Sequence, residues 1–241
     1  MIIKLKTMPE FIHDNQSIFY ELVNPSRFSE RTPILMLHGN GEDMEIFQDV
    51  LLSLLRFKSF VLMDSRLHGH SHPLENGSRK LSYEAIASDA LALMEHLGIK
   101  EYDVVGYSDG GIAALMMAMR SKSIRRIMTI GANTDPSGLT MRARREMSAA
   151  YKAALTEGDE NTAELMRLML EEPHISAEML ASITCEVTIV LGSRDRFISQ
   201  KHSERIAALI PRASHIVIEG AGHGIPISNA EELAQLIKKV F

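Results

Sequence analysis

Short apolar runs alternate with longer amphipathic segments along the chain, and this alternation restricts its possible folds more than any other feature. Strand-like runs occupy residues 2–5, 17–23, 33–40, 59–64, 102–107, 126–132, 186–192 and 215–220. Helical periodicity marks residues 44–55, 83–97, 110–120, 202–210 and 231–240. Regular alternation of strands and helices indicates βαβ crossovers, in which a helix connects two parallel strands. The sequence therefore predicts an α/β fold with a mostly parallel eight-stranded sheet flanked by helices.

One interval interrupts the alternation. Residues 133–183 contain no convincing strand, only helix-forming segments such as MRARREMSAAYKAAL and NTAELMRLMLEE. A connection of about fifty residues is too long for an ordinary loop between two strands. We therefore expect a helical cap at 133–183, inserted into a core domain made of residues 1–132 and 184–241.

Composition excludes several classes of protein. The formal net charge of −5 disfavours non-specific binding to nucleic acid, which needs a basic surface. The single cysteine, Cys185, cannot form an intramolecular disulfide and is typical of a reducing compartment. The N-terminus lacks a signal-peptide run, and no long apolar segment predicts a membrane span. We expect a cytoplasmic protein without nucleic-acid or membrane partners, and a homodimer through the cap or an edge strand stays open.

The stretch VVGYSDGG places Ser108 between a predicted strand and a predicted helix. Gly106 and Gly110 flank it in the pattern G-x-S-x-G. In so tight a turn the serine backbone is strained, and small residues on either side let the strand and the helix pass without a clash. The hydroxyl then projects above the carboxyl edge of the sheet. The pattern alone also fits a serine that caps a helix, but its context favours a nucleophile.

A serine nucleophile needs a base, and the base needs a carboxylate that orients it. Asp195 follows the strand at 186–192, and His223 follows the strand at 215–220. Both residues are thus predicted at the carboxyl ends of parallel strands, where open sheets carry their sites. Each has an ordinary alternative, a loop acid paired with a neighbouring arginine and a capped loop histidine. Agreement of the three placements favours Ser108, Asp195 and His223 as a catalytic triad.

The oxyanion that forms on a substrate carbonyl needs hydrogen-bond donors. The backbone N–H after the nucleophile, that of Asp109, is one predicted donor. The second is assigned to the N–H of Asn40 in the loop His38-Gly39-Asn40-Gly41, for which a plain glycine turn is the alternative. Two carboxylates could compete with Asp195, but Asp103 is predicted at the far end of the sheet and the Asp109 side chain is expected to point elsewhere.

Two charged or metal-binding patterns have simpler explanations. Histidines at alternate positions (His68, His70 and His72) could suggest a metal site, but their loop is rich in Gly, Ser and Pro. This composition favours an exposed loop near the cap, and we predict no metal and no cofactor. A basic cluster in the cap (Arg142, Arg144 and Arg145) could face an anionic substrate, although a solvated helix face is the favoured interpretation.

Five motifs resemble, in order and spacing, the landmarks of the α/β-hydrolase superfamily: LHGN, DSRLHGHS at 64–71, GYSDGG, LGSRD and GAGH. The chain looks like a small bacterial serine hydrolase with a helical cap, and only the cap is nondescript. The resemblance implies Ser108 as nucleophile, Asp195 as acid and His223 as base, with the Asp109 and Asn40 amides as the oxyanion hole. Leu67-His68 departs from the family's D-x-R-G-x-G-x-S loop.

These residues imply an enzyme that hydrolyses a carboxylic ester, or a related acyl bond, of a small molecule through an acyl-enzyme on Ser108. Thioester, amide or carbon–carbon bond hydrolysis and lyase chemistry are alternatives on the same frame. A haloalkane dehalogenase would need a carboxylate where Ser108 stands. Outside catalysis, a ligand receptor with slow turnover is the alternative, and the turnover rate discriminates between the two.

Overall fold

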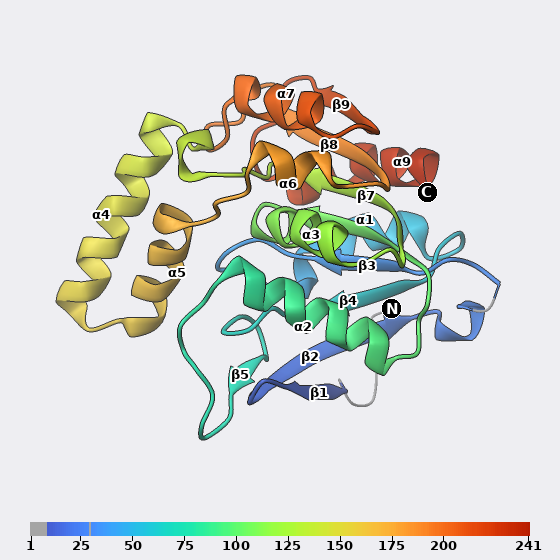
Figure 1. The fold of residues 1–241 in the computed structure, drawn as a ribbon, viewed down its shortest axis with the longest axis horizontal. Coiled ribbons are helices and arrows are strands. Elements are labelled where there is room, and N and C mark those ends of the chain that lie inside the picture. The colour runs from blue at the N-terminus through green and yellow to red at the C-terminus, as the bar shows by residue number, and fades with distance from the viewer. Residues whose placement is uncertain (1–8, 29) are drawn as a thin grey trace.

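A twisted sheet crosses the middle of the molecule with helices on both sides, as Figure 1 shows. The computed structural model describes residues 9–28 and 30–241, so the strand expected at 2–5 lies outside the described residues. The strands are β1 (Glu10–His13), β2 (Gln16–Val23), β3 (Ile34–Leu37), β4 (Phe60–Met63), β5 (His72–Pro73), β6 (Tyr102–Tyr107), β7 (Ile124–Ile130), β8 (Glu186–Gly192) and β9 (Ala213–Ile218).

The strand order confirms the predicted, mostly parallel sheet. Eight strands follow the order β1-β2-β4-β3-β6-β7-β8-β9, and the two-residue β5 pairs with β2 off this path. Among the named strands of the described residues, the antiparallel pairs are those of β2 with β1, β4 and β5. β1 was not predicted, because its alternating residues are only partly buried and leave no apolar run. It turns into β2 through Asp14 and Asn15, both with positive φ, which asparagine and aspartate tolerate well.

Helices cover both faces of the sheet. They are α1 (Gln48–Leu54), α2 (Tyr83–His96), α3 (Asp109–Arg120), α4 (Met141–Glu157), α5 (Glu160–Glu171), α6 (Ala177–Ala181), α7 (Gln200–Leu209), α8 (Ile225–Ser228) and α9 (Ala230–Val240). In β3, Leu35 and Leu37 pack into one core cluster with α2 and α3, whereas Ile34 and Met36 pack into another with α1 and α9. Burial on both faces explains why this strand is a continuous apolar run.

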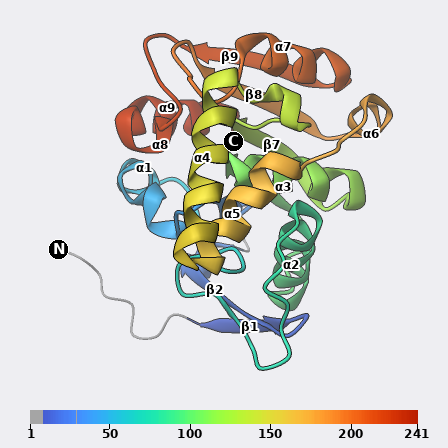
Figure 2. The same cartoon turned by 90° about the vertical axis from the view of Figure 1, so that its left-hand side faces the viewer.

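The three helices α4, α5 and α6 lie between β7 and β8 in the chain. α4 and α5 pack against each other to one side of the sheet (left in Figure 1), and they face the viewer in Figure 2. Thr140 caps the start of α4, Gly158 ends it with φ 74°, and Asp159 caps α5. α6 instead packs against α3 and α7. None of the helices in the described ranges is long and apolar enough to cross a membrane.

Candidate active site

Ser108 occupies a strained turn between β6 and α3. Its backbone angles, φ 51° and ψ −115°, lie outside the regions that non-glycine residues normally populate. The two flanking glycines have no room for a side chain. A Cβ on Gly106 would lie 2.3 Å from the carbonyl oxygen of Gly110, and a Cβ on Gly110 would lie 2.1 Å from that of Leu37. The pattern G-x-S-x-G is therefore a packing requirement at this turn.

The structure brings Ser108, His223 and Asp195 together. The distance from Nε2 of His223 to Oγ of Ser108 is 3.1 Å, and Nδ1 of His223 lies 2.7 Å from Oδ2 of Asp195. The Asp195 side chain is 1% exposed and that of His223 is 14% exposed. An aspartate carboxylate can only accept, so Nδ1 carries the proton and Nε2 is free to accept the serine proton.

Several neighbours hold this arrangement in place. The amides of Phe197 and Ile198 donate to Oδ1 of Asp195, at 2.7 and 3.0 Å. The Phe197 ring lies against the His223 ring with 4.9 Å between centroids. Gly131, just after β7 with φ 65°, leaves space for that ring, because a Cβ there would lie 2.8 Å from Cε1 of His223. These supports could not be predicted from the sequence, since only folding brings them next to the histidine.

The two predicted oxyanion residues also meet. No acceptor for the backbone N–H of Asn40 or Asp109 occurs among residues 9–28 and 30–241. The carboxylate of Asp109 accepts from Nδ2 of Asn40 at 3.0 Å and from the hydroxyl of Tyr83 at 2.9 Å, whereas the carboxylate bonded to His223 is that of Asp195. Burial raises the pKa of Asp109, although these two hydrogen bonds oppose the shift.

A cavity of about 740 Å³ opens in front of Ser108. Its far wall comes from α4 and α5 and includes four apolar side chains: Met147, Leu165, Met166 and Met169. The titratable groups on its walls are histidine, tyrosine and three acids, Glu42, Asp109 and Glu146. No lysine or arginine lines the cavity within the described part of the chain. The cavity thus combines an apolar wall on α4 and α5 with three carboxyl groups, one of them on α4.

Glu42 is a carboxyl group that the sequence analysis did not single out. Its Oε2 atom is buried and has no hydrogen-bond partner in the described residues. Gly39 separates this atom from the serine: a Cβ on Gly39 would lie 2.8 Å from Oε2 and 3.2 Å from Cβ of Ser108. Burial raises the pKa of Glu42 to about 7, although the Gly39 amide and His223 both act to lower this pKa. Nothing local in the loop GNGED marks this acid in the sequence.

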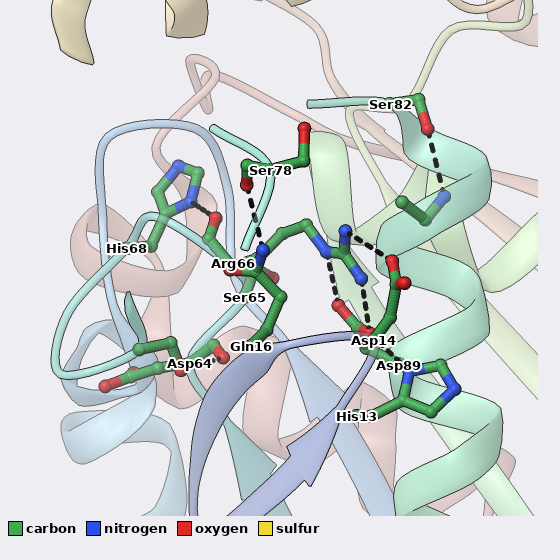
Figure 3. A network of polar contacts seen from close by, with 12 residues as sticks. His13, Asp14, Gln16, Asp64, Ser65, Arg66, His68, Ser78, Ser82 and Asp89 are labelled. Atoms are coloured by element: carbon green, nitrogen blue, oxygen red, sulfur yellow. Dashed lines mark hydrogen bonds and ion pairs between the residues drawn. The ribbon is translucent and has the colours of Figure 1, made fainter. Parts of the chain in front are cut away.

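A buried ion-pair network anchors the loop at residues 64–71 (Figure 3). Nε and Nη2 of Arg66 each lie 2.6 Å from an oxygen of Asp89 on α2, and Nδ1 of His13 lies 2.7 Å from the same carboxylate. Oδ1 of Asp64 accepts from the Met44 amide at 2.9 Å. These contacts tie the loop to α2, β1 and the segment that precedes α1.

The histidine loop differs partly from the prediction. His70 and His72 are exposed, but His68 is only 5% exposed, so an exposed loop is wrong for this residue. Its ring packs on the buried His38 ring at 5.1 Å between centroids, and the preceding Leu67 has a positive φ of 62°. Within the described ranges, no group of three His, Cys, Asp or Glu side chains could hold a metal ion.

The other charged residues lie outside the cavity. Arg142, Arg144 and Arg145 are exposed on α4, and Arg142 pairs with Glu146 at 2.7 Å, as a solvated helix face would. None of the three lines the cavity.

Asp103, the other carboxylate considered above, lies near the start of β6, where Nη2 of Arg126 lies 3.2 Å from its Oδ2 atom. Neither the arginine cluster nor Asp103 reaches Ser108, which confirms the favoured interpretations of both.

A serine on a strained strand-to-helix turn, bonded to a histidine from a later loop of a mostly parallel sheet, defines the class of α/β hydrolases. Residues 32–157, just over half of the chain, match the family model described as alpha/beta hydrolase fold. The chain belongs to this family and is a hydrolase of the α/β fold.

Similar proteins include hydrolases from distant organisms. Serine hydrolase BPHL of Mus musculus is 29% identical over 227 residues, which cover 85% of this chain and 77% of that protein. Esterase YbfF of Escherichia coli (strain K12) is 22% identical and aligned over 86% of this chain and 92% of the esterase. A solved carboxylesterase structure from Nitrososphaera gargenis superposes with a TM-score of 0.82 at 17% identity, over 96% and 97% of the two chains.

Proposed function

We propose that this protein is a serine hydrolase that cleaves a carboxylic ester, or a related acyl bond, of a small molecule through an acyl-enzyme on Ser108. One observation carries the proposal: the chain of hydrogen bonds from Ser108 through His223 to the buried Asp195, at the wall of a cavity large enough for a small molecule. The curated relatives named as a serine hydrolase and an esterase support the same reaction class.

The geometry supplies each step of the reaction. Nε2 of His223 takes the proton of Ser108 as Oγ attacks the acyl carbonyl, and the amides of Asn40 and Asp109 stabilise the oxyanion. The imidazolium then protonates the leaving group, and the acyl-enzyme forms. Water, deprotonated by the same histidine, releases the acid and regenerates Ser108. Asp195 keeps the proton on Nδ1 and stabilises the imidazolium.

The cavity also bears on the substrate. In this proposal, residues 133–183 form a cap whose helices α4 and α5 bind the apolar part of the acyl group, and residues 1–132 and 184–241 form the catalytic core. Among the described residues, a negatively charged acyl group would meet three carboxyl groups and no lysine or arginine. We therefore propose that the enzyme hydrolyses esters of neutral, moderately apolar acyl groups faster than esters of anionic ones. Substrates that carry a free carboxylate on the acyl group are disfavoured.

Matched p-nitrophenyl esters test this proposal. We expect rapid release from neutral esters with a preferred acyl length, and release at least roughly tenfold slower, in kcat/KM, from the mono-p-nitrophenyl ester of succinic acid than from the butyrate ester, because desolvating one charge beside acids costs over 1 kcal/mol. Equal rates for the two esters would contradict the acyl-group selectivity.

A fluorophosphonate probe separates the remaining outcomes. Labelling of Ser108 without release from any ester would contradict ester hydrolysis and would favour carbon–carbon bond cleavage, lyase chemistry or a receptor with slow turnover. Absence of both labelling and release would leave Ser108 as a helix cap. The labelled residue is identified by mass spectrometry of the peptide that contains positions 106–110.

Glu42 should make hydrolysis depend on pH near neutrality. Because burial raises its pKa to about 7, Glu42 is mostly neutral below that pH and mostly ionised above it. The ionised form places a negative charge beside Gly39 and Ser108, where it opposes the oxyanion. We expect kcat/KM to fall as the pH rises through about 7, and Glu42→Gln, which stays neutral, to remove this fall.

Glu146→Gln is the matched control, because Glu146 lines the same cavity but is 53% exposed. This variant should keep the decline above neutral pH. The measurement is kcat/KM for one neutral ester from pH 5.5 to 9 in buffers of constant ionic strength. A decline of the same size and midpoint in Glu42→Gln would show that Glu42 does not cause it.

A further inference from the structure

The side chains of the two predicted oxyanion residues are bonded to each other. Nδ2 of Asn40 donates to Oδ2 of Asp109 across 3.0 Å. Asn40 belongs to the loop after β3, whereas Asp109 is the first residue of α3. The hydrogen bond therefore joins two separate segments at the point where each presents a backbone N–H without an acceptor in the described residues.

Tyr83 completes the contacts of Asp109. The Tyr83 hydroxyl, at the start of α2, donates to Oδ1 of Asp109 at 2.9 Å, and the two residues are 1% and 6% exposed. Both oxygens of Asp109 thus have partners from the protein. Asp109 lies on the cavity wall, but both of its carboxylate oxygens are already bonded to protein side chains.

Helix α5 is part of the same set of contacts. Nδ2 of Asn40 also lies 3.3 Å from the carbonyl oxygen of Leu165 on α5. Two further residues tie this region to the start of α2: Nη2 of Arg167 donates to the Leu81 carbonyl oxygen at 2.7 Å, and Oε2 of Glu172 accepts from the Tyr83 amide at 3.2 Å. The cavity wall and the oxyanion residues are therefore connected through partly buried hydrogen bonds.

We propose that Asn40, Tyr83 and Asp109 form a positioning network that holds the two oxyanion amides in register and links their placement to helix α5. This inference rests on the proposed function, because it concerns the placement of the backbone amides of Asn40 and Asp109, which stabilise the oxyanion in that function. Oxyanion donors act only when they are fixed before the reaction, and the loss of one donor slows catalysis by about 10²- to 10³-fold. Residues that orient the donors, without touching the substrate, should have a smaller but measurable effect.

Two substitutions test the network. Tyr83→Phe removes one hydrogen bond and keeps the ring, and we expect kcat/KM to fall roughly tenfold; Asn40→Ala breaks both the link to Asp109 and the link to α5, and we expect a fall of roughly a hundredfold. A trifluoromethyl ketone, whose carbonyl carbon is attacked by Oγ of Ser108 to give a hemiketal anion while His223 takes the serine proton, should lose affinity in parallel with kcat/KM. KM for a neutral ester should change much less than kcat.

The double variant and a matched control sharpen the test. If the residues act as one unit, the combined substitution should cost less than the product of the single effects. Tyr102→Phe is the control, because Tyr102 is also buried but begins β6 at the opposite end of the strand from Ser108. It should change the thermal midpoint without changing kcat/KM or the affinity for the ketone.

The outcomes distinguish this inference from the proposed function. Normal kcat/KM and normal ketone affinity in Tyr83→Phe and Asn40→Ala would overturn the network and leave the hydrolase intact. Losses of kcat/KM that scale with the fall in thermal midpoint, and that Tyr102→Phe shows as well, would also overturn it, because they indicate a purely structural role. Absence of serine-dependent turnover in the native protein would contradict the proposed function itself, before any variant is compared.

Discussion

Replacement of Ser108 by alanine should lower ester turnover by roughly 10⁴-fold or more while the protein still folds. Alanine removes the Oγ atom that lies 3.1 Å from Nε2 of His223, and no other hydroxyl in the described residues is bonded to that nitrogen. The remaining oxyanion amides and the cavity would still bind and polarise the substrate. Turnover by attack of water therefore persists only at a low level.

The measurement compares kcat/KM for native and Ser108→Ala protein on the same neutral ester, with active-site titration to exclude traces of native enzyme. A thermal midpoint close to that of the native protein would show that the fold is kept. Alanine is as strained as serine at φ 51°, so the substitution leaves the backbone demand of the turn unchanged. Retained turnover in a well-folded variant would contradict the assignment of Ser108 as nucleophile.

Replacement of Asp195 by asparagine should have the second largest effect, a loss of roughly 10⁴-fold in kcat near neutral pH. The reason lies in the two amides of Phe197 and Ile198, which donate to Oδ1. They would hold the asparagine oxygen in that position and turn its NH₂ group toward His223. Nδ1 would then have to accept, Nε2 would carry the proton, and the ring could not take the proton of Ser108.

The predicted change in the His223 tautomer can be tested separately from the loss of kcat. Nitrogen-15 spectra of the imidazole should show the proton on Nδ1 in the native protein and on Nε2 in Asp195→Asn. Ser193→Ala is the control in the same loop, because the half-buried Ser193 side chain contacts Glu219 instead of the histidine. Unchanged kcat in Asp195→Asn, or an unchanged tautomer with reduced kcat, would contradict this explanation.

The positions of Ser108, Asp195 and His223 along the chain could be read from the G-x-S-x-G pattern together with the periodicity of the strands. Each follows an apolar run that forms a parallel strand, and the carboxyl ends of parallel strands lie on one edge of the sheet. Local rules therefore sufficed to place the three residues on the same side of the molecule. The strand Glu10–His13 escaped the same reasoning, because an edge hairpin with partly buried residues carries no apolar run.

Contacts between distant segments could not be read in this way. Glu42, Tyr83, Gly131 and Phe197 look ordinary in the sequence, since nothing local distinguishes them from other loop and helix residues. Their roles depend on which neighbours they meet: Gly131 and Phe197 at the histidine ring, Tyr83 at Asp109, and Glu42 beside Gly39. The burial of His68, which composition predicted to be exposed, has the same origin.

The amino-acid sequence by itself determined the α/β sheet, the turn at Ser108 and the identity of the side chains at the carboxyl edge, because these follow from hydrophobic period and from steric limits within a few residues. Only the tertiary structure decided the distances among them, the acidic character of the cavity and the link between the oxyanion residues and α5. Burial and long-range hydrogen bonds set these properties, and both depend on segments up to 125 residues apart in the chain.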